Sequence, residues 1–192
     1  MRTEIEAKFL SVGIDRIRKK LDAAGATLEV PMRMMSRVLF EGDDKSSYVR
    51  LRDEGDKTTL TYKRFDELSV DGAKEIEVEV GGFETTLTIL EKAGLKTDSY
   101  QESKRETWIL DEVEVVIDQW PWLDPYIEIE GLSEQAVKDV AQKLGFDWNE
   151  AVFGDVSSAY AVQYARLPKN LVENIGEIGD IRFDMEKPKA LG

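Results

Sequence analysis

The residues Glu4-Ile-Glu-Ala-Lys8 alternate charged and apolar side chains at a period of two. On a β-strand alternate side chains share one face, so two carboxylates and one ammonium would lie side by side. Paired carboxylates suit a divalent cation that prefers oxygen ligands, and a lysine beside them suits a phosphate oxygen. The spacing therefore indicates nucleotide or polyphosphate chemistry. The alternative is a solvated strand face with cross-strand ion pairs.

The same alternation returns on later segments, and this recurrence favours a built site over a solvated face. The recurring charges are Arg50 and Arg52, then Lys63, then Glu75, Glu77 and Glu79, and finally Glu128 and Glu130 after Asp118. Isolated charges inside a closed sheet would be costly. A metal bound by the carboxylates and a phosphate bound by the lysines and arginines would instead neutralise these charges.

The composition limits the chemistry open to such a site. The 192 residues include no histidine and no cysteine, which excludes histidine acid–base catalysis, histidine-bound zinc and thiolate metal sites. Carboxylate ligands favour Mg²⁺, Mn²⁺ or Ca²⁺, and we expect Mg²⁺ or Mn²⁺ as the cofactor. A net charge of −13 makes nucleic acids and anionic membranes poor partners. Neither a membrane helix nor a signal peptide is predicted, so we expect a cytoplasmic protein.

The periodicities predict an α+β chain dominated by antiparallel strands. Helices are predicted from Ile14 to Ala24, from Phe83 to about Gly94, and from the capping residue Ser133 to Leu144. A mostly helical region is predicted at 150–176, with Pro168 starting a short final helix. The predicted strands cover 3–10, 32–40, 48–53, 58–64, 73–80, 104–110, 113–118 and 126–130.

A sheet that closes on itself would accommodate both kinds of strand face. The charged face would line a central cavity. The aliphatic face, which includes Ile5, Ile76, Val78 and Ile129, would need a core of its own beneath helices. We therefore expect a closed antiparallel β-barrel flanked by helices.

Glu4-Ile-Glu-Ala-Lys8 resembles the ExExK motif of the CYTH superfamily, the triphosphate tunnel metalloenzymes. That family includes class IV adenylyl cyclases, thiamine triphosphatases and inorganic triphosphatases. The resemblance runs in order over residues 3–165 and also rests on Arg50-Leu-Arg52, Lys63, Glu75-Ile-Glu77, Lys104-Arg105, Asp118 and Glu128-Ile-Glu130. It implies an eight-stranded antiparallel tunnel. The tunnel domain would cover 1–178, including the C-terminal helices, and a charged tail would follow at 179–192.

The resemblance also implies a role for each charged position. The metal ligands would be Glu4, Glu6, Asp118, Glu128 and Glu130. The substrate-binding cations would be Lys8, Arg37, Arg50, Arg52, Lys63, Lys104 and Arg105. The catalytic residues would be Glu4, Glu6, Lys8, Glu75 and Glu77, the last two as candidates for positioning water.

One position departs from the family pattern. The later basic motif is commonly K-x-R, but Ser103 stands where its lysine would be. The adjacent Lys104 would point to the opposite face of the strand unless the strand bulges. The phosphate clamp would then be one charge weaker at this place.

Three functions fit these observations. We favour metal-dependent hydrolysis of a triphosphate, with inorganic tripolyphosphate, thiamine triphosphate and nucleoside triphosphates as candidate substrates. A class IV-type adenylyl cyclase, which makes cyclic AMP and pyrophosphate from ATP, is the second. A non-catalytic binder of polyphosphate or nucleotide is the third.

Aromatic residues bear on this choice. Trp108, Trp120 and Trp122 would either stack on a base or thiamine ring, or pack in the core and rim. Tyr160, Tyr164 and Leu167 have helical spacing, which predicts a helix packed on the barrel. A homodimer is compatible with the sequence, but no residue of it indicates where two copies would meet.

Overall fold

A computed structural model of the chain describes residues 1–44, 46–164 and 179–191. The strands are β1 (Arg2–Thr3), β2 (Ile5–Phe9), β3 (Thr27–Glu41), β4 (Ser47–Asp53), β5 (Thr58–Phe65), β6 (Ala73–Val80), β7 (Thr97–Leu110), β8 (Val113–Gln119) and β9 (Tyr126–Gly131). The helices are α1 (Ile14–Ala24), α2 (Phe83–Lys92), α3 (Glu134–Lys143) and α4 (Val156–Gln163), with short 3₁₀ turns η1 (Trp148–Glu150) and η3 (Lys189–Leu191). None of the helices in these ranges is long and apolar enough to cross a membrane.

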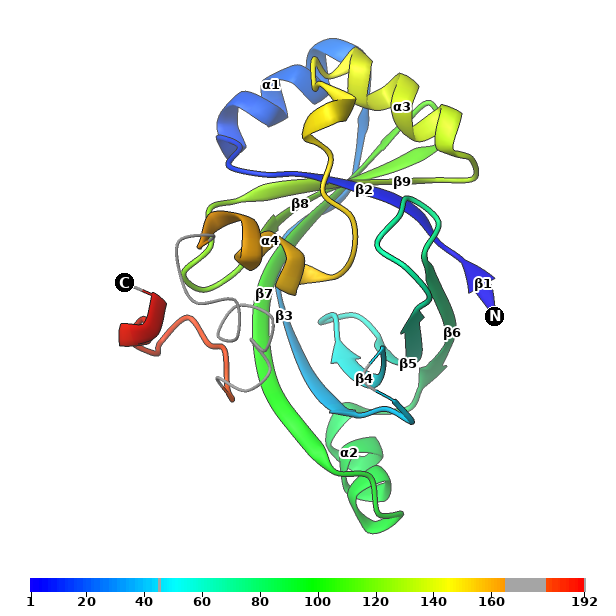
Figure 1. Cartoon of the computed structure of the whole chain (residues 1–192), viewed down its shortest axis with the longest axis vertical. Coiled ribbons are helices and arrows are strands. Elements are labelled where there is room, and N and C mark those ends of the chain that lie inside the picture. The colour runs from blue at the N-terminus through cyan, green and yellow to red at the C-terminus, as the bar shows by residue number, and fades with distance from the viewer. Residues whose placement is uncertain (45, 165–178, 192) are drawn as a thin grey trace.

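All strands belong to one antiparallel sheet that curls into a nearly closed barrel (Figure 1). The strand order is β1-β6-β5-β4-β3-β7-β8-β9-β2. The N-terminal segment joins the two edges, because Arg2 pairs with Glu75 of β6 and Glu6 pairs with Glu130 of β9. The seam of the barrel, where the N-terminal segment passes from β6 to β9, lies at Glu4. The N–H of Glu4 donates to the carbonyl of Ala73 at 2.9 Å.

The expected α+β barrel is therefore confirmed, with nine strands in place of eight. The difference arises at Glu4, because the single strand predicted over 3–10 changes partner there and is divided into β1 and β2. A change of partner depends on strands far away in the sequence, so the local alternation of residue types does not reveal it.

The two strands β3 and β7 are longer than predicted, with 15 and 14 residues. They cross the whole barrel side by side, and their pairing contains register shifts near Pro31 and between Leu39 and Phe40. Proline lacks a ladder donor and is tolerated at such irregularities. The sequence pattern missed the first part of each strand, because polar residues dominate Thr97–Ser103 and Pro31 argues against a strand that continues across it.

The main core lies on the outer face of β2, β8 and β9, beneath α1 and α3 (Figure 1). Ile17 and Leu21 of α1 and Val137 of α3 pack against buried strand residues that include Ile127 and Ile129. These strand residues alternate with charged neighbours, so burying the aliphatic row forces the charged row into the barrel.

A second core covers the outside of β3 and β4 beneath α2. Phe83 and Leu87 of α2 pack against the cluster that contains Val38 and Leu51. On β6, by contrast, the expectation of a core beneath Ile76 and Val78 is wrong. Their exposed fractions are 56% and 54%. Only towards the end of this strand, at Val80, does the outer face pack against the core beneath α2 in the described residues.

A third core stands beside the barrel, where α4 meets the Trp120 loop and the C-terminal segment. Tyr160 donates from its hydroxyl to the carbonyl of Pro121 at 2.5 Å. Ile181 is fully buried and exchanges backbone hydrogen bonds of 2.9 and 2.8 Å with β7. The tail thus contacts the tunnel wall. Leu167, the rest of the helical region predicted to reach 176 and the helix predicted from Pro168 lie outside the described residues.

Candidate active site inside the barrel

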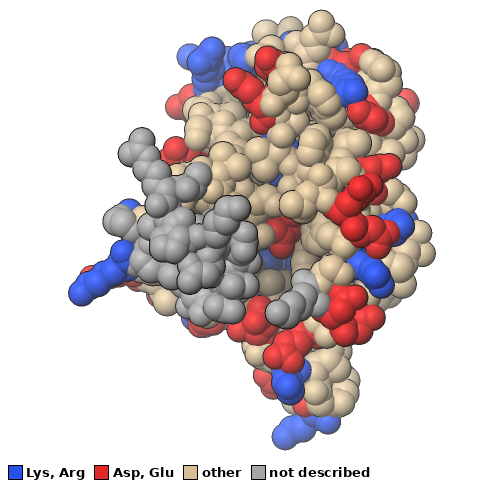
Figure 2. Space-filling model, viewed as in Figure 1, with Lys and Arg blue, Asp and Glu red and all other residues tan. Residues whose placement is uncertain are grey.

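The inner face of the sheet encloses a cavity of about 1270 Å³. Alternation along each strand supplies its lining, because Arg50 and Arg52 face inward while Leu51 faces the core beneath α2. Figure 2 shows acidic side chains gathered on the right-hand side of the face that Figure 1 presents. Of the sequence-predicted site residues, the following line the cavity: Glu4, Glu6, Lys8, Arg37, Arg50, Arg52, Lys63, Glu75, Glu77, Arg105, Glu128 and Glu130.

Glutamates and two lysines make one wall of the cavity, on and beside β2 and β9. Lys8 Nζ lies 2.8 Å from Glu6 Oε1 and 2.9 Å from Glu128 Oε2. Lys63 reaches from β5 to contact Glu4 Oε2. Burial alone would lower the pKa of Lys8, but the charges of Glu128 and Glu6 raise it above its ordinary value. The lysines are therefore internal counterions of the carboxylates.

The carboxylates of this wall nevertheless repel one another. Burial and the negative charges of Glu4 and Glu128 raise the pKa of Glu130 to about 8. Burial and Glu128 also raise the pKa of Glu6, which lies directly across the strand pair from Glu130. On the other side, burial and the hydrogen bond with Glu4 raise the pKa of Glu75 to about 7. Despite burial, nearby lysines lower the pKa of Glu4 and Glu128, so the protein's own cations compensate only part of the negative charge here.

This donor set fits a divalent cation of the Mg²⁺ or Mn²⁺ kind. Crowded carboxylates are the ligands that such hard cations prefer, and a cation would remove their mutual repulsion. As the described residues are placed, however, no three acidic side chains are grouped so that they could hold a metal ion together. Three of the four carboxylates on this wall, Glu4, Glu6 and Glu128, contact lysine ammonium groups. The fourth, Glu130, lies 2.8 Å from the guanidinium of Arg2. A metal cation would have to compete with these groups or displace them.

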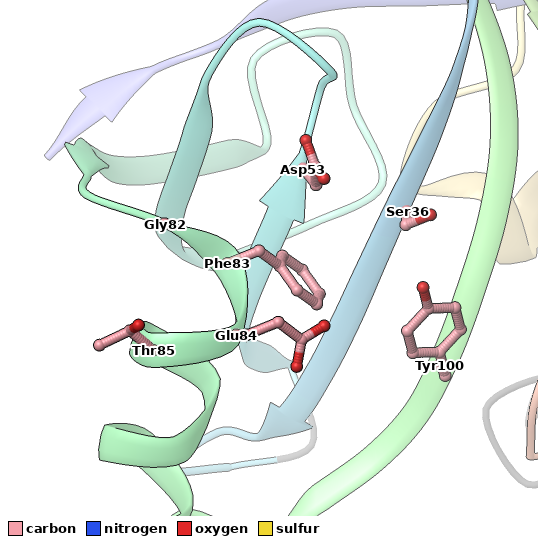
Figure 3. A pocket seen from close by; sticks show the side chains of 7 residues that line it. All are labelled: Ser36, Asp53, Gly82, Phe83, Glu84, Thr85 and Tyr100. Atoms are coloured by element: carbon pink, nitrogen blue, oxygen red, sulfur yellow. The ribbon is translucent and has the colours of Figure 1, made fainter.

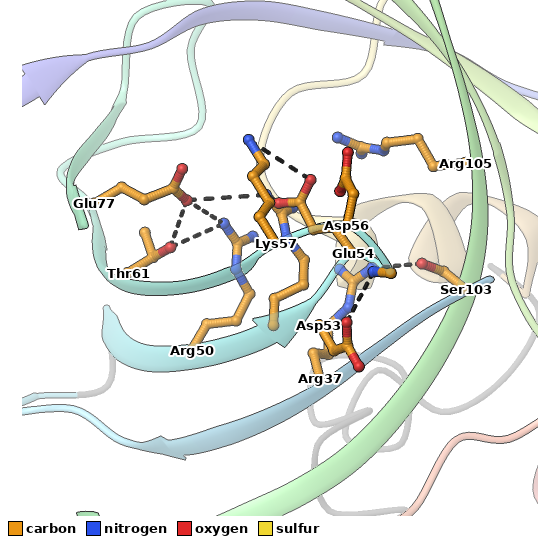
Figure 4. A network of polar contacts seen from close by, with 12 residues as sticks. Arg37, Arg50, Asp53, Glu54, Asp56, Lys57, Thr61, Glu77, Ser103 and Arg105 are labelled. Carbon is orange, nitrogen blue, oxygen red and sulfur yellow. Dashed lines mark hydrogen bonds and ion pairs between the residues drawn. The ribbon is translucent and has the colours of Figure 1, made fainter. Parts of the chain in front are cut away.

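Guanidiniums from β3, β4 and β7 make the facing wall (Figure 4). Arg52 lies 2.6 Å from Glu54 Oε1, and Arg50 and Arg52 lie 3.5 and 3.8 Å from Glu77 Oε2. Burial and the charges of Arg50 and Arg105 lower the pKa of Arg52 to about 10. Positive charge is therefore crowded on this side, as a site for a polyanion requires.

Two predicted site residues lie elsewhere. Asp118 does not line the cavity: it is 1% exposed, and its two oxygens accept hydrogen bonds of 2.8 and 2.6 Å from Arg105. Lys104 points to the outside of the barrel, where its Nζ lies 4.9 Å from the ring centroid of Phe183. The strand does not bulge at this point, so Lys104 follows the outward alternation of β7 and is absent from the cationic wall.

The family comparison decides what kind of protein has this architecture. A model of the CYTH domain matches residues 2–151 of the chain. This chain belongs to the CYTH family. Members of that family are triphosphatases or adenylyl cyclases, and their enzymes depend on a divalent metal.

Solved structures share the CYTH fold at low sequence identity. The PH1012 protein of Pyrococcus horikoshii OT3 superposes with a TM-score of 0.69 at 23% identity, over 77% of this chain and 93% of that one. A proposed adenylate cyclase of Vibrio parahaemolyticus gives 0.68 at 10% identity, over 80% and 95%. The Hippeastrum protein HpAC1, a proposed adenylyl cyclase described as having a dominant triphosphatase activity, gives 0.58 at 17%, over 86% and 97%. No curated protein matches the chain.

Among the acidic residues that line the CYTH tunnel and were not predicted from the sequence are Glu54 and Glu114. Glu54, 5% exposed, binds Arg52 and lies 3.0 Å from Arg33. Glu114 lines the cavity and pairs across the strands with Glu130. The period-two pattern could have found both, because Arg50-x-Arg52-x-Glu54 and Glu114-x-Val116-x-Asp118 continue inward-facing rows.

The three tryptophans considered as base-stacking groups all contact other residues of the protein. Trp108 is buried in the main core and donates from Nε1 to Glu106 at 2.7 Å. Trp120 lies beneath the guanidinium of Arg37, and Trp122 donates to the carbonyl of Met185 at 3.3 Å. Packing in core and rim therefore accounts for all three.

A smaller hollow of about 360 Å³ lies outside the barrel, between α2 and the strands β3, β4 and β7 (Figure 3). Its lining includes Asp53 and Glu84 but no lysine or arginine. It therefore has no feature of a phosphate site.

Proposed function

We propose that this CYTH protein is a divalent-metal-dependent triphosphatase that hydrolyses its substrate inside the barrel. The observation that carries the proposal is the division of one cavity into two charged walls. Carboxylates are crowded on β2 and β9, and guanidiniums are crowded on β3, β4 and β7. Arg105 lies where the two walls meet, 3.6 Å from Glu128. A metal-bound triphosphate presents the complementary charges to both walls.

The chain's own residues have distinct tasks in this proposal. Glu4, Glu6, Glu128 and Glu130 would hold Mg²⁺ or Mn²⁺, which supplies charge neutralisation and a water of lowered pKa when bound. Planar guanidiniums match phosphate oxygens in pairs, whereas ammonium groups act as point charges. The groups that bind the phosphates are Lys8, Arg37, Arg50, Arg52, Lys63 and Arg105. Asp118, although predicted as a metal ligand, would act by orienting Arg105.

Glu75 and Glu77 are the candidates for handling water. With a pKa of about 7, Glu75 is partly ionised near neutrality and is suited to accept a proton from the attacking water. The carboxylate of Glu77 accepts a hydrogen bond of 2.7 Å from Thr61 and faces Arg50 and Arg52. It is therefore held beside the phosphate-binding groups, where it would orient water for in-line attack on the terminal phosphorus.

Hydrolysis is preferred to cyclisation because the charged walls complement a triphosphate, whereas the tryptophans considered for a nucleobase have partners in the protein. The cyclase needs an adenine site. Of the three tryptophans considered for it, Trp108 and Trp122 do not line the cavity, and the ring of Trp120, which does, is stacked against Arg37. The reported dominant activity of the Hippeastrum relative supports the same choice. The cyclase and the non-catalytic binder remain the alternatives, and cytoplasmic location and homodimerisation remain predictions.

The test is an assay of products. Purified protein is incubated with tripolyphosphate, thiamine triphosphate or ATP, each with Mg²⁺, with Mn²⁺ or with a chelator. Metal-dependent release of orthophosphate is the expected result, and the best substrate identifies the physiological class. Formation of cyclic AMP and pyrophosphate from ATP would instead identify a cyclase. Binding of all three compounds without any product would identify a binder.

A further inference from the structure

Arg37 differs from the other cations that line the tunnel. Lys8, Lys63, Arg50, Arg52 and Arg105 each contact at least one carboxylate. Arg37 makes no ion pair with any residue that the structure describes, although it is only 6% exposed. A buried charge without a counterion is unfavourable, so its presence needs an explanation.

Two neighbours hold the guanidinium of Arg37 in place. Its plane lies over the ring of Trp120, with 4.4 Å between the guanidinium carbon and the ring centroid. Its NH2 group donates to the hydroxyl of Ser103 on the adjacent strand β7, as Figure 4 shows. The stacking and the hydrogen bond fix both the position and the orientation of the group.

Two hydrogen-bond donors of the stacked Arg37 and Trp120 side chains are unsatisfied within the described part of the chain. Neither Arg37 Nε nor Trp120 Nε1 has a hydrogen-bond partner among the described residues, and both side chains line the cavity. Buried donors without partners are rare in folded proteins, and a missing ligand is one of their ordinary explanations. Burial and the charges of Arg52 and Arg50 lower the pKa of Arg37 to about 9, so an anion at this place would be strongly favoured.

The small side chain of Ser103 on β7 leaves room for Arg37, which comes from the neighbouring strand β3. The side chain of Ser103 is fully buried, and its hydroxyl is in contact with Arg37. A lysine at this position would occupy the volume that the guanidinium fills. The small serine therefore makes room for a cation from the neighbouring strand.

We propose that Arg37 replaces the lysine missing from position 103 and binds a phosphate oxygen of the substrate, with Trp120 and Ser103 as its positioning residues. The inference rests on the proposed function for the triphosphate nature of that substrate. It adds an anion subsite beside the Trp120 loop, built from β3 and β7.

The test measures binding of tripolyphosphate by calorimetry in the presence of a chelator, so that turnover does not enter the result. Arg37→Met should weaken binding roughly 10- to 100-fold, the range expected for a charge-assisted hydrogen bond. Trp120→Leu should weaken it roughly 3- to 30-fold through loss of the stacked ring. Trp120→Phe keeps a ring and should lose less than Trp120→Leu. Lys104→Met, one residue from Ser103 but outside the barrel, should bind like the wild type.

The decisive variant combines Arg37→Met with Ser103→Lys. It moves the positive charge back to β7 and should regain most of the affinity that Arg37→Met loses. Unchanged binding by a folded Arg37→Met variant, or no recovery in a folded double variant, would overturn the inference. Circular dichroism establishes folding of each variant.

Phosphate release, measured separately with Mg²⁺, distinguishes this inference from the proposed function. Turnover by the wild type with unchanged binding by Arg37→Met would refute the inference alone. Binding by the wild type that depends on Arg37 but yields no product would refute the hydrolase alone.

Discussion

At the residue scale, the tunnel is a set of charges that compensate one another incompletely. Arg105 illustrates the compensated kind, because both of its hydrogen bonds go to the buried carboxylate of Asp118. Burial would lower the pKa of Arg105, but Asp118 and Glu128 raise it. Breaking such a pair leaves an uncompensated charge in a site shielded from water, which is far more destabilising than breaking a surface pair.

Replacement of Asp118 by Asn should therefore destabilise the protein by about 3–5 kcal/mol, since Arg105 would lose its counterion. The matched control is Asp111→Asn, which removes the surface ion pair with Lys143, where the aspartate side chain is 62% exposed. Loss of that pair should cost about 1 kcal/mol or less. Urea unfolding of the two variants measures both values. Equal losses would show that Asp118 has no special structural role.

At the element scale, the C-terminal segment is part of the barrel wall. The β8 pairing covers β7 only from Lys104 onward, so the preceding half of β7 has an open edge on that side. Ile181 forms a parallel bridge with Gln101 at this edge and fills the core that also holds Trp120 and Tyr160. The segment therefore supports the loop against which Arg37 stacks.

Ile181→Ala tests this arrangement. Shortening a fully buried isoleucine should cost about 2–5 kcal/mol of unfolding free energy, because it leaves a cavity beside Trp120 and Tyr160. Met185→Ala, in the same segment but at a side chain that is 40% exposed, is the control and should cost much less. Thermal and urea unfolding measure the difference. An Ile181→Ala variant as stable as the control would mean that the segment contributes nothing to the barrel.

The sequence predicts those features of the strands and helices that depend on neighbouring residues, and not those that depend on distant ones. The alternation in Glu4-Ile-Glu-Ala-Lys8 or Arg50-Leu-Arg52 is local, so it predicted which side chains enter the tunnel. The change of partner at Glu4, the docking of Ile181 and the contact between Arg37 and Ser103 join residues far apart in sequence. No periodicity records such contacts, and they arise only once the strands are ordered.

At the scale of the whole molecule, the acidic wall makes stability depend on pH and on divalent cations. In the folded state the pKa of Glu130 is raised to about 8 from an ordinary value of 4.5. A carboxyl group with a raised folded pKa contributes its full stability below the unfolded pKa and loses it as pH rises through the folded one. The metal-free protein should therefore become less stable between about pH 4.5 and 8.

Thermal unfolding in a chelator at pH 5 and pH 8 checks this expectation. The melting temperature should be higher at pH 5, and Glu130→Gln should reduce the difference because it removes the titrating group. Mg²⁺ should raise the melting temperature most at pH 8, where the carboxylates are ionised and bind the cation. The account would be contradicted by equal melting temperatures at both pH values, or by a pH dependence that Glu130→Gln leaves unchanged.

The central claim is that carboxylates on the first strands hold the metal for hydrolysis of a triphosphate in the tunnel. The most direct measurement is orthophosphate release from tripolyphosphate with Mg²⁺ or Mn²⁺, by the wild type and by the double variant Glu4→Gln, Glu6→Gln. We predict metal-dependent release by the wild type and only background release by the double variant, with its fold retained. Full activity in the double variant would contradict the site.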